Sequence, residues 1–234
     1  MDDDDVPDHK LLEEHWISHQ KNAAENIAIL GHTNIDQKIA QNPLMHFVTQ
    51  VGCQLFCYPK IEENALLDYT YFWGGRSSCK SSFLLKNNSY FNKIFTFGCE
   101  DIELGYRLSK YDLKVIYNKK AISTMIRMIS LKDFCRRTEN QGYSNWIFSR
   151  IHQEEEISSW CFVNNLENEW NRIKNLFDHY KKSAEDLDEL INIRLKNGMN
   201  IPDNLLDTLH KAYWLTIDSH RLRGSYKASL KGEI

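Results

Sequence analysis

The feature that most constrains the fold of this chain is a change of sequence pattern near residue 154. Before this point, short apolar runs typical of strands alternate with helical stretches and glycine-containing loops. After it, glycine and strand signals thin out, and apolar residues recur at helical spacing. The pattern predicts an α/β domain over residues 1–153 and a helical C-terminal extension over residues 154–234.

Local signals place the expected elements within these two parts. Strands are expected at residues 26–30, 55–59, 69–73 and 113–117, and helices after Pro7, after Pro43, at residues 77–85, at residues 100–111 and at residues 131–141, ending before Gly142. In the extension, one long amphipathic helix is expected from residue 160 to 180, continued to Gly198, with a last helix after Pro202. His15 and Trp16 share an apolar helical face and are expected in the core.

The composition excludes several classes of protein. The net charge of −3 gives no electrostatic reason to expect nucleic-acid binding. No apolar run approaches the ~20 residues that span a bilayer, and the acidic start MDDDDVPDHK is the opposite of a signal peptide. We therefore expect a cytoplasmic protein. Its six cysteines lack the paired spacing of a zinc site, so reduced thiols are expected.

Two groups of acidic residues are candidates for chemistry. In an extended segment, Asp2 and Asp4 point the same way and offer two oxygen ligands to Mg²⁺ or Mn²⁺, although a solvated terminus or an engineered tag gives the same run. Asp3 and Asp5 stay open as alternatives. Glu100 and Asp101 precede or open a helix, where carboxylates are also favoured by the helix dipole alone.

Four stretches together resemble the second half of a family 2 glycosyltransferase domain of the GT-A type. They are DDDDVPDHKLLEEH, WGGRSSCKSSFLL, FTFGCEDIELGYRLSKYDLKVIYN and ISLKDFCRRTENQGYS. They resemble, in order, the metal-binding D-x-D segment, the acceptor-side loop and helix, the E-D-x-E-L-G-x-R-L helix with its strand, and the helix after the last metal-site loop. The resemblance implies a GT-A-like mixed sheet flanked by helices, truncated at its N-terminus because the nucleotide-binding half is missing.

The resemblance also implies roles for individual residues. Asp2 and Asp4 would hold the divalent ion at the donor diphosphate, and Asp101 would be the general base, oriented by Glu100. Three residues would line the acceptor pocket: Trp73, Gly74 and Gly75. The activity implied is the transfer of a sugar, with inversion, from a nucleotide-sugar donor to a hydroxyl of a glycan, lipid-linked or protein acceptor.

Two positions depart from the family pattern. Met125 stands where a metal-binding His is expected, and a thioether is a poor ligand for Mg²⁺ or Mn²⁺. Arg127, two residues further on, is a candidate phosphate contact or else a solvated or core-edge side chain. Arg76 replaces an expected Asn, which changes the acceptor contacts.

Other interpretations stay open beside catalysis. The chain is alternatively a non-catalytic remnant, or one half of a split enzyme whose partner chain supplies the missing part. A third interpretation makes the helical extension a docking module for other proteins. A basic strip on the 131–141 helix (Lys132, Arg136, Arg137) is either solvated or a peripheral contact with an anionic membrane.

Overall fold

The computed structural model describes residues 4–232, and the chain divides into two compact units. Unit 1 comprises Met1–Ala40, Phe56–Ile94 and Glu100–Met128, and unit 2 comprises Gln41–Leu55, Phe95–Cys99 and Ile129–Ile234. Both units are therefore assembled from segments far apart in the sequence.

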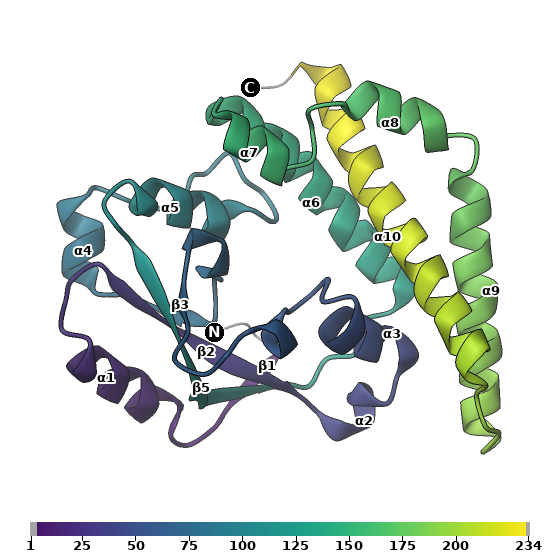
Figure 1. The fold of residues 1–234 in the computed structure, drawn as a ribbon, viewed down its shortest axis with the longest axis horizontal. Helices are drawn as coiled ribbons and strands as arrows, with labels where there is room; N and C mark the ends of the chain where they lie inside the picture. The colour runs from purple at the N-terminus through teal and green to yellow at the C-terminus, as the bar shows by residue number, and fades with distance from the viewer. Residues whose placement is uncertain (1–3, 233–234) are drawn as a thin grey trace. The chain divides into compact units, whose positions relative to one another are not determined.

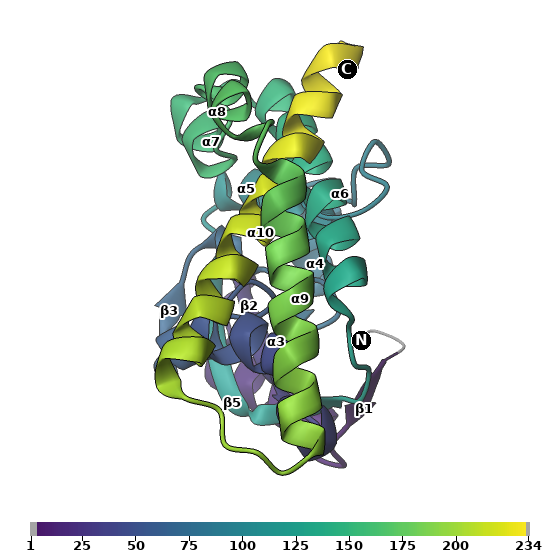
Figure 2. The same cartoon turned by 90° about the vertical axis from the view of Figure 1, so that its right-hand side faces the viewer.

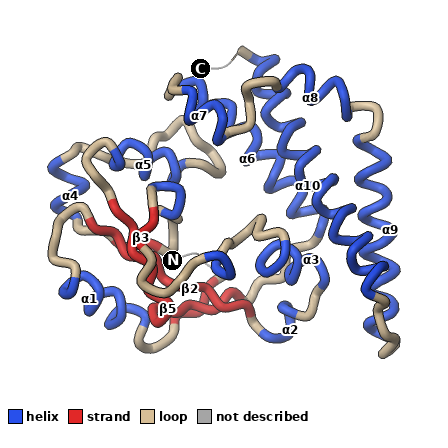
Figure 3. The backbone as a smooth tube through the Cα atoms, viewed as in Figure 1, coloured by secondary structure: helices blue, strands red, loops and turns tan. Residues whose placement is uncertain are grey.

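A five-stranded mixed sheet forms the centre of unit 1 (Figures 1 and 3). Its strands are β1 (Asp5–Pro7), β2 (Ile27–Ile35), β3 (Leu66–Leu67), β4 (Ser77–Ser78) and β5 (Lys114–Met125). They lie in the order β1-β5-β2-β4, and β3 also pairs with β5. Strands β2 and β5 are parallel, whereas the other pairs are antiparallel. The predicted fold class, a mixed sheet flanked by helices, is confirmed at this level.

The sequence explains why β2 and β5 are central. Ala28, Ile29 and Leu30 on β2 are fully buried, as are Val115 and nearly all of Tyr117 on β5. Continuous apolar runs of this kind are typical of parallel strands covered on both faces. The helices of this unit are α1 (Leu11–Lys21), α2 (Gln37–Ala40), α4 (Ser81–Lys86) and α5 (Glu100–Ser109), and α1 packs against β2 and β5.

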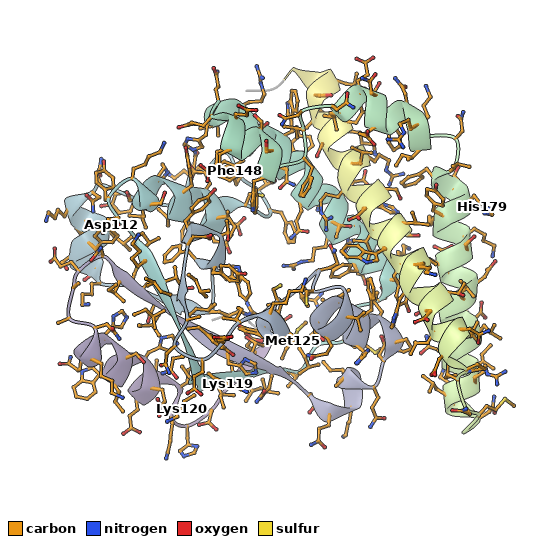
Figure 4. The ribbon with its side chains drawn as sticks, in the orientation of Figure 1. Asp112, Lys119, Lys120, Met125, Phe148 and His179 are labelled. Carbon is orange, nitrogen blue, oxygen red and sulfur yellow. The ribbon has the colours of Figure 1, made fainter. Side chains whose placement is uncertain are left out.

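A bulge in β5 interrupts the pairing of the two central strands. Leu30 pairs with Tyr117, but His32 pairs with Ile122, so residues 118–121 of β5 lie opposite Gly31 alone. Lys119 and Lys120 lie in this bulge (Figure 4). A Cβ at Gly31 would come within 2.7 Å of the Ala121 carbonyl oxygen, so the position requires glycine. Strand β2 thus continues past Gly31, where the sequence predicted its end.

Unit 2 is helical. It contains α3 (Pro43–His46), α6 (Leu131–Ile151), α7 (Glu155–Trp160), α8 (Leu166–Ile173), α9 (Phe177–Lys196) and α10 (Asp203–Lys231), and a π-helical turn, Phe47–Val51, follows α3. Helix α10 packs along α6, and α8 and α9 also pack against it (Figure 2). The core of unit 2 is formed by side chains from α3, the π-helical turn, α6, α9 and α10. Its buried residues include Leu44, Phe47, Phe134, Ile191, Leu209, Tyr213 and Ile217.

The helical extension does not stand apart from the preceding sequence. Helix α6, which was assigned to the first predicted domain, makes its main packing contact with α10 of the extension. Ser225 on α10 donates a hydrogen bond to the Gly142 carbonyl oxygen on α6 at 2.8 Å. The boundary predicted between residues 153 and 154 stays a prediction. The two compact units divide the chain after residues 40, 55, 94, 99 and 128.

Several predicted elements are wrong. The aromatic segments at residues 55–59 and 69–73 form 3₁₀ turns, Tyr58–Lys60 and Tyr69–Tyr71, instead of strands. Pro59 cannot donate to a strand ladder, and Asp68 caps the second turn by accepting from the Thr70 N–H at 2.8 Å. Aromatic side chains are buried here by packing, which local pattern does not distinguish from a strand.

The helix predictions fail at three places. Helix α6 continues through Gly142, and the predicted helix over residues 160–180 breaks into α7, α8 and the start of α9. Helix α4 begins at Ser81, because Ser77 and Ser78 pair with β2 instead. Trp16, predicted in the core, is 63% exposed.

Over residues 4–232, none of the helices combines the length and apolar character needed to cross a membrane.

Candidate functional site

The described residues among those predicted for the site lie within unit 1, and a tight turn at residues 73–77 contacts two of the acids. The Trp73 carbonyl oxygen accepts a hydrogen bond from the Ser77 N–H at 3.0 Å. Gly75 has a φ of +75°, which favours glycine at this point of the turn. The Trp73 indole N–H donates to the Thr70 carbonyl oxygen at 2.9 Å, so the turn is fixed at its start.

Asp101 is bound to this turn. It lies in the first turn of α5, and its Oδ2 accepts a hydrogen bond from the Gly74 N–H at 2.7 Å. Its Oδ1 accepts from the Ile102 N–H at 2.8 Å. A Cβ on Gly74 would lie 3.4 Å from Oδ2, so the glycine lets the backbone approach the carboxylate closely.

The remaining acids of α5 have different environments. Glu100 is half-buried at the first position of the helix. Glu103 is fully buried, and its Oε1 receives a hydrogen bond from Arg107 Nε at 2.9 Å. Glu103 therefore has a structural partner one turn along the same helix.

The acidic amino end joins the sheet next to Met125. Asp5 is paired with Met125 in the β1–β5 ladder, and the Ile126 N–H donates to the Asp4 carbonyl oxygen at 3.0 Å. The structure therefore places the end of β5 beside the acidic segment. Asp4 is half-buried, and Arg127, which follows Ile126, is exposed. Asp2 lies outside the described residues, as does Asp3.

Asp5 is engaged by Arg76. Arg76 Nη2 lies 2.9 Å from Asp5 Oδ2, and the two side chains are 8% and 0% exposed. Arg76 also donates from Nε to Thr33 Oγ1 at 3.0 Å and lies over the Phe56 ring at 4.5 Å. A guanidinium held in this way makes Asp5 an ion-pair partner, which argues against it as an alternative metal ligand.

Aromatic rings that were not predicted as site residues surround Trp73. Its ring centroid lies 5.4 Å from that of Tyr58, in an edge-to-face arrangement, and 5.6 Å from that of Tyr71. The Tyr58 hydroxyl donates to the Gly31 carbonyl oxygen at 3.0 Å, and burial raises the pKa of Tyr58 to about 12. The aromatic composition of residues 55–59 and 69–73 is the sequence signal for this cluster, and it predicted two strands instead.

The described residues do not by themselves fit a resident divalent ion. Among residues 4–232, no group of three or more His, Cys, Asp or Glu side chains is arranged to hold a metal. Near the start of β1, Met125 offers only a thioether, and the Asp5 carboxylate is ion-paired with Arg76. The metal prediction rests on Asp2 and Asp4 together and stays a prediction.

The 73–77 turn thus contacts residues from both groups of acids that the sequence singled out. Gly74 binds Asp101, and Arg76 binds Asp5. Both contacts lie within unit 1. Arg127 has no described contact with either carboxylate.

Comparison with known proteins gives no relative from which a role can be transferred. No known family matches the sequence, and no similar protein was found among curated proteins or among solved structures.

Proposed function

We propose that unit 1 is a GT-A-like glycosyltransferase fold of family 2 and that it transfers a sugar from a nucleotide-sugar donor to a hydroxyl acceptor. The observation that carries the proposal is the double engagement of the 73–77 turn. Its Gly74 N–H binds the Asp101 carboxylate at 2.7 Å, and its Arg76 guanidinium binds Asp5 at 2.9 Å. The contacts support the proposal because they bring the loop that resembles the acceptor-side loop against both the base candidate and the acidic segment.

In the proposed reaction, Asp101 is the general base. The acceptor oxygen forms a bond to the anomeric carbon of the donor while the bond from that carbon to the diphosphate oxygen breaks. The acceptor proton passes to the Asp101 carboxylate, and the electron pair of the broken bond leaves with the nucleoside diphosphate. Attack from the face opposite the leaving group inverts the configuration of the sugar.

The remaining predicted residues have supporting roles in this proposal. Glu100, beside Asp101 at the start of α5, orients the base or the acceptor. The Trp73 ring and the glycines of the turn line the acceptor side. Arg127, exposed at the end of β5, contacts the donor diphosphate as a cation. Met125 stands where the resemblance expects a metal-binding His, so a divalent ion at the donor diphosphate would be held by Asp2 and Asp4 and would neutralise the charge of the leaving group.

The test combines donor binding with turnover. The protein is titrated by calorimetry with UDP-, GDP- and TDP-sugars, with and without Mn²⁺, and release of the nucleoside diphosphate is followed. Asp101→Asn keeps one oxygen that accepts from the Gly74 N–H, loses the acceptor for the Ile102 N–H and removes the base. We expect it to lower turnover at least about 100-fold and to leave donor affinity within about twofold.

The control is Asp112→Asn, which removes an exposed carboxylate just beyond the other end of α5 (Figure 4). It should leave turnover unchanged. Turnover that is equal in the Asp101→Asn variant would remove Asp101 from the base role, and absence of donor binding under every condition would contradict the proposal as a whole.

A second candidate, a non-catalytic binding protein of the same fold, is favoured by one specific observation. Both oxygens of Asp101 accept backbone N–H bonds, at 2.7 and 2.8 Å. Hydrogen bonds to the charged form of a carboxylate make it a weaker base. In this case, donor binding would be measurable, but nucleotide release would be equally slow in the protein and in its Asp101→Asn variant.

A further inference from the structure

An exposed apolar tip follows α4 in unit 1. It consists of Leu85, Tyr90, Phe91 and Ile94, which are 64%, 59%, 56% and 38% exposed. Large apolar side chains scattered singly on a surface are ordinary, but this segment presents four of them within ten residues. The tip is independent of the residues proposed for sugar transfer.

The tip is held in a defined conformation. The Ser89 N–H donates to the Leu84 carbonyl oxygen at 3.0 Å, which turns the chain back beside the last turn of α4. Phe83 and Ser89 are buried beneath it, with 4% and 3% of their surfaces exposed. The Tyr90 carbonyl oxygen also accepts a hydrogen bond from Arg107 on α5. The apolar side chains are therefore exposed on an anchored segment.

Arg107 itself is fixed from the other side. Its Nε and Nη2 bind the two oxygens of the buried Glu103 carboxylate at 2.9 and 3.1 Å. The backbone of the tip is thus tied through Arg107 to α5. An anchored apolar tip loses little conformational entropy when it enters an apolar phase.

The charged residues of the segment that carries the tip are all basic. Between Asp68 and Glu100 the sequence contains no acidic residue, although the whole chain has a net charge of −3. Of its four basic residues, Arg76 is buried against Asp5 and Lys80 donates to the Asn22 and Ala24 carbonyl oxygens, whereas Lys86 and Lys93 are exposed at the tip. Lys93 is exposed between Phe91 and Ile94.

Lys86 directly follows Leu85 and is also exposed. Its ammonium lies 3.8 Å from the Glu25 carboxylate, and both side chains are at least half exposed. Surface pairs of this kind contribute little and are easily exchanged for another partner. Lys86 therefore remains available to an anionic surface.

We propose that this tip binds the surface of an anionic phospholipid bilayer. Tyr90 and Phe91 enter the boundary between headgroups and acyl chains, where aromatic rings are favoured, and the two lysines bind lipid phosphates beside them. Each lysine near an anionic leaflet strengthens binding about fivefold. A purely apolar partner would not account for the acid-free run, and a purely electrostatic one would not account for four exposed apolar side chains.

The experiment measures partitioning of the full chain onto vesicles by co-sedimentation. Vesicles of phosphatidylcholine containing about one third phosphatidylglycerol are compared with vesicles of phosphatidylcholine alone. We expect binding to the mixed vesicles to be at least tenfold stronger and to weaken as salt is added. Tyr90→Ser with Phe91→Ser should lower it at least tenfold, and Lys86→Gln with Lys93→Gln about 25-fold.

The chain offers a matched control on α1. Leu12 and Trp16 are also strongly exposed, at 82% and 63%, but they flank the acidic Glu13 and Glu14. Leu12→Ser with Trp16→Ser removes at least as much exposed apolar surface as Tyr90→Ser with Phe91→Ser, but next to acidic instead of basic residues. Binding to the mixed vesicles should be unchanged in this variant. Circular dichroism of each variant checks that the fold is retained.

Three outcomes would overturn the proposal. One is binding that is insensitive to the Tyr90 and Phe91 substitutions, which would indicate adsorption by charge alone. Another is a loss of vesicle binding in the Leu12→Ser with Trp16→Ser control that equals the loss in the Tyr90→Ser with Phe91→Ser variant. The third is a concentration-dependent dimer that the Tyr90 and Phe91 substitutions abolish, with no vesicle binding, because the occupant would then be a second copy of the chain.

Discussion

At the scale of single residues, the contact between Arg76 and Asp5 has the largest predicted energetic consequence. Both side chains are nearly or fully buried, and the guanidinium lies 2.9 Å from the carboxylate. Removing one member of a buried pair leaves a charge in a poorly solvated place, which costs about 3–5 kcal/mol. Arg76→Met should therefore lower the free energy of unfolding by that amount in urea denaturation.

The control for this prediction is an exposed pair. Arg136 lies 3.0 Å from Asp133, and the two side chains are 74% and 51% exposed. Arg136→Met should change the free energy of unfolding by less than about 1 kcal/mol. A double variant, Asp5→Asn with Arg76→Met, should lose less than the sum of the two single variants. Strict additivity would show that the pair contributes nothing.

A second residue-scale prediction concerns the dependence of stability on pH. The Ser78 hydroxyl lies 2.7 Å from His15 Nδ1 and 3.0 Å from His19 Nε2. Burial, and then the charge of His19, lowers the pKa of His15 from 6.5 to about 4. The unfolded chain therefore binds a proton at His15 in a pH range where the folded chain does not.

Stability linked to His15 is complete above about pH 6.5 and is lost as the pH falls towards about 4. The loss is at most about 3.5 kcal/mol, since one pKa unit corresponds to about 1.4 kcal/mol. Urea denaturation between pH 7 and 4 should show a shallower decline for His15→Gln than for the unmodified chain. His9→Gln, at a strongly exposed site, is the control; identical slopes for the two variants would contradict the prediction.

The two acid groups illustrate what single residues reveal in a sequence. The first turn of α5 was predicted because its signals are local: acids at the start, then apolar residues at helical spacing. The partner of Asp5 was not predictable, since Arg76 lies far along the chain and was noted only as a departure from a family pattern. A carboxylate in an acidic run is equally compatible with a metal site and with a buried ion pair until the fold supplies its neighbour.

At the scale of elements, close packing of α6 and α10 explains two glycines inside helices. A Cβ on Gly142 would lie 1.9 Å from the Arg221 carbonyl oxygen, and one on Gly224 would lie 1.9 Å from the Glu139 carbonyl oxygen. The sequence interpretation took Gly142 as the end of a helix, because glycine usually interrupts helices. In this unit the glycine instead lets two helix backbones approach each other.

This packing gives a prediction with a definite sign. Helix propensity alone would make Gly142→Ala stabilising by about 1 kcal/mol. Because the Cβ would overlap a backbone oxygen, we expect a loss of at least about 2 kcal/mol instead, measured by thermal or urea denaturation. Gly224→Ala should behave in the same way, and a gain in stability for either variant would contradict the packing.

A polar cluster reinforces the same pair of helices. Glu139 on α6 binds Arg223 and Lys227 on α10, with its carboxylate 2.7 Å from the Lys227 ammonium. Burial opposes the charged form of Glu139, but the hydrogen bonds from the two cations outweigh it and lower the pKa to about 2. The amphipathic spacing of the last helix was readable from the sequence, whereas its main partner, α6, was not.

At the scale of the whole chain, segments of the two units alternate along the sequence. The chain passes from one unit to the other after residues 40, 55, 94, 99 and 128. The sequence analysis detected the change of composition near residue 154, but composition reports the local preference of a segment and not the segment with which it packs. Helices α3 and α6, which precede residue 154, belong to unit 2 because their apolar side chains pack in one buried cluster with those of α9 and α10.

This assembly predicts the behaviour of a chain cut at the compositional boundary. A fragment of residues 1–153 retains Leu44, Phe47 and Phe134 but lacks Leu209 and Tyr213, with which they form one buried cluster. Exposing the three retained side chains costs about 1.5–3 kcal/mol each, or about 4.5–9 kcal/mol together, which is comparable with the whole stability of an ordinary domain. We expect the fragment to be insoluble or to bind a hydrophobic dye without a cooperative thermal transition.

Supplying residues 154–234 as a second chain should restore both solubility and the transition, because the lost contacts are non-covalent. A soluble, monomeric fragment with its own sharp transition would instead establish residue 153 as a true domain boundary.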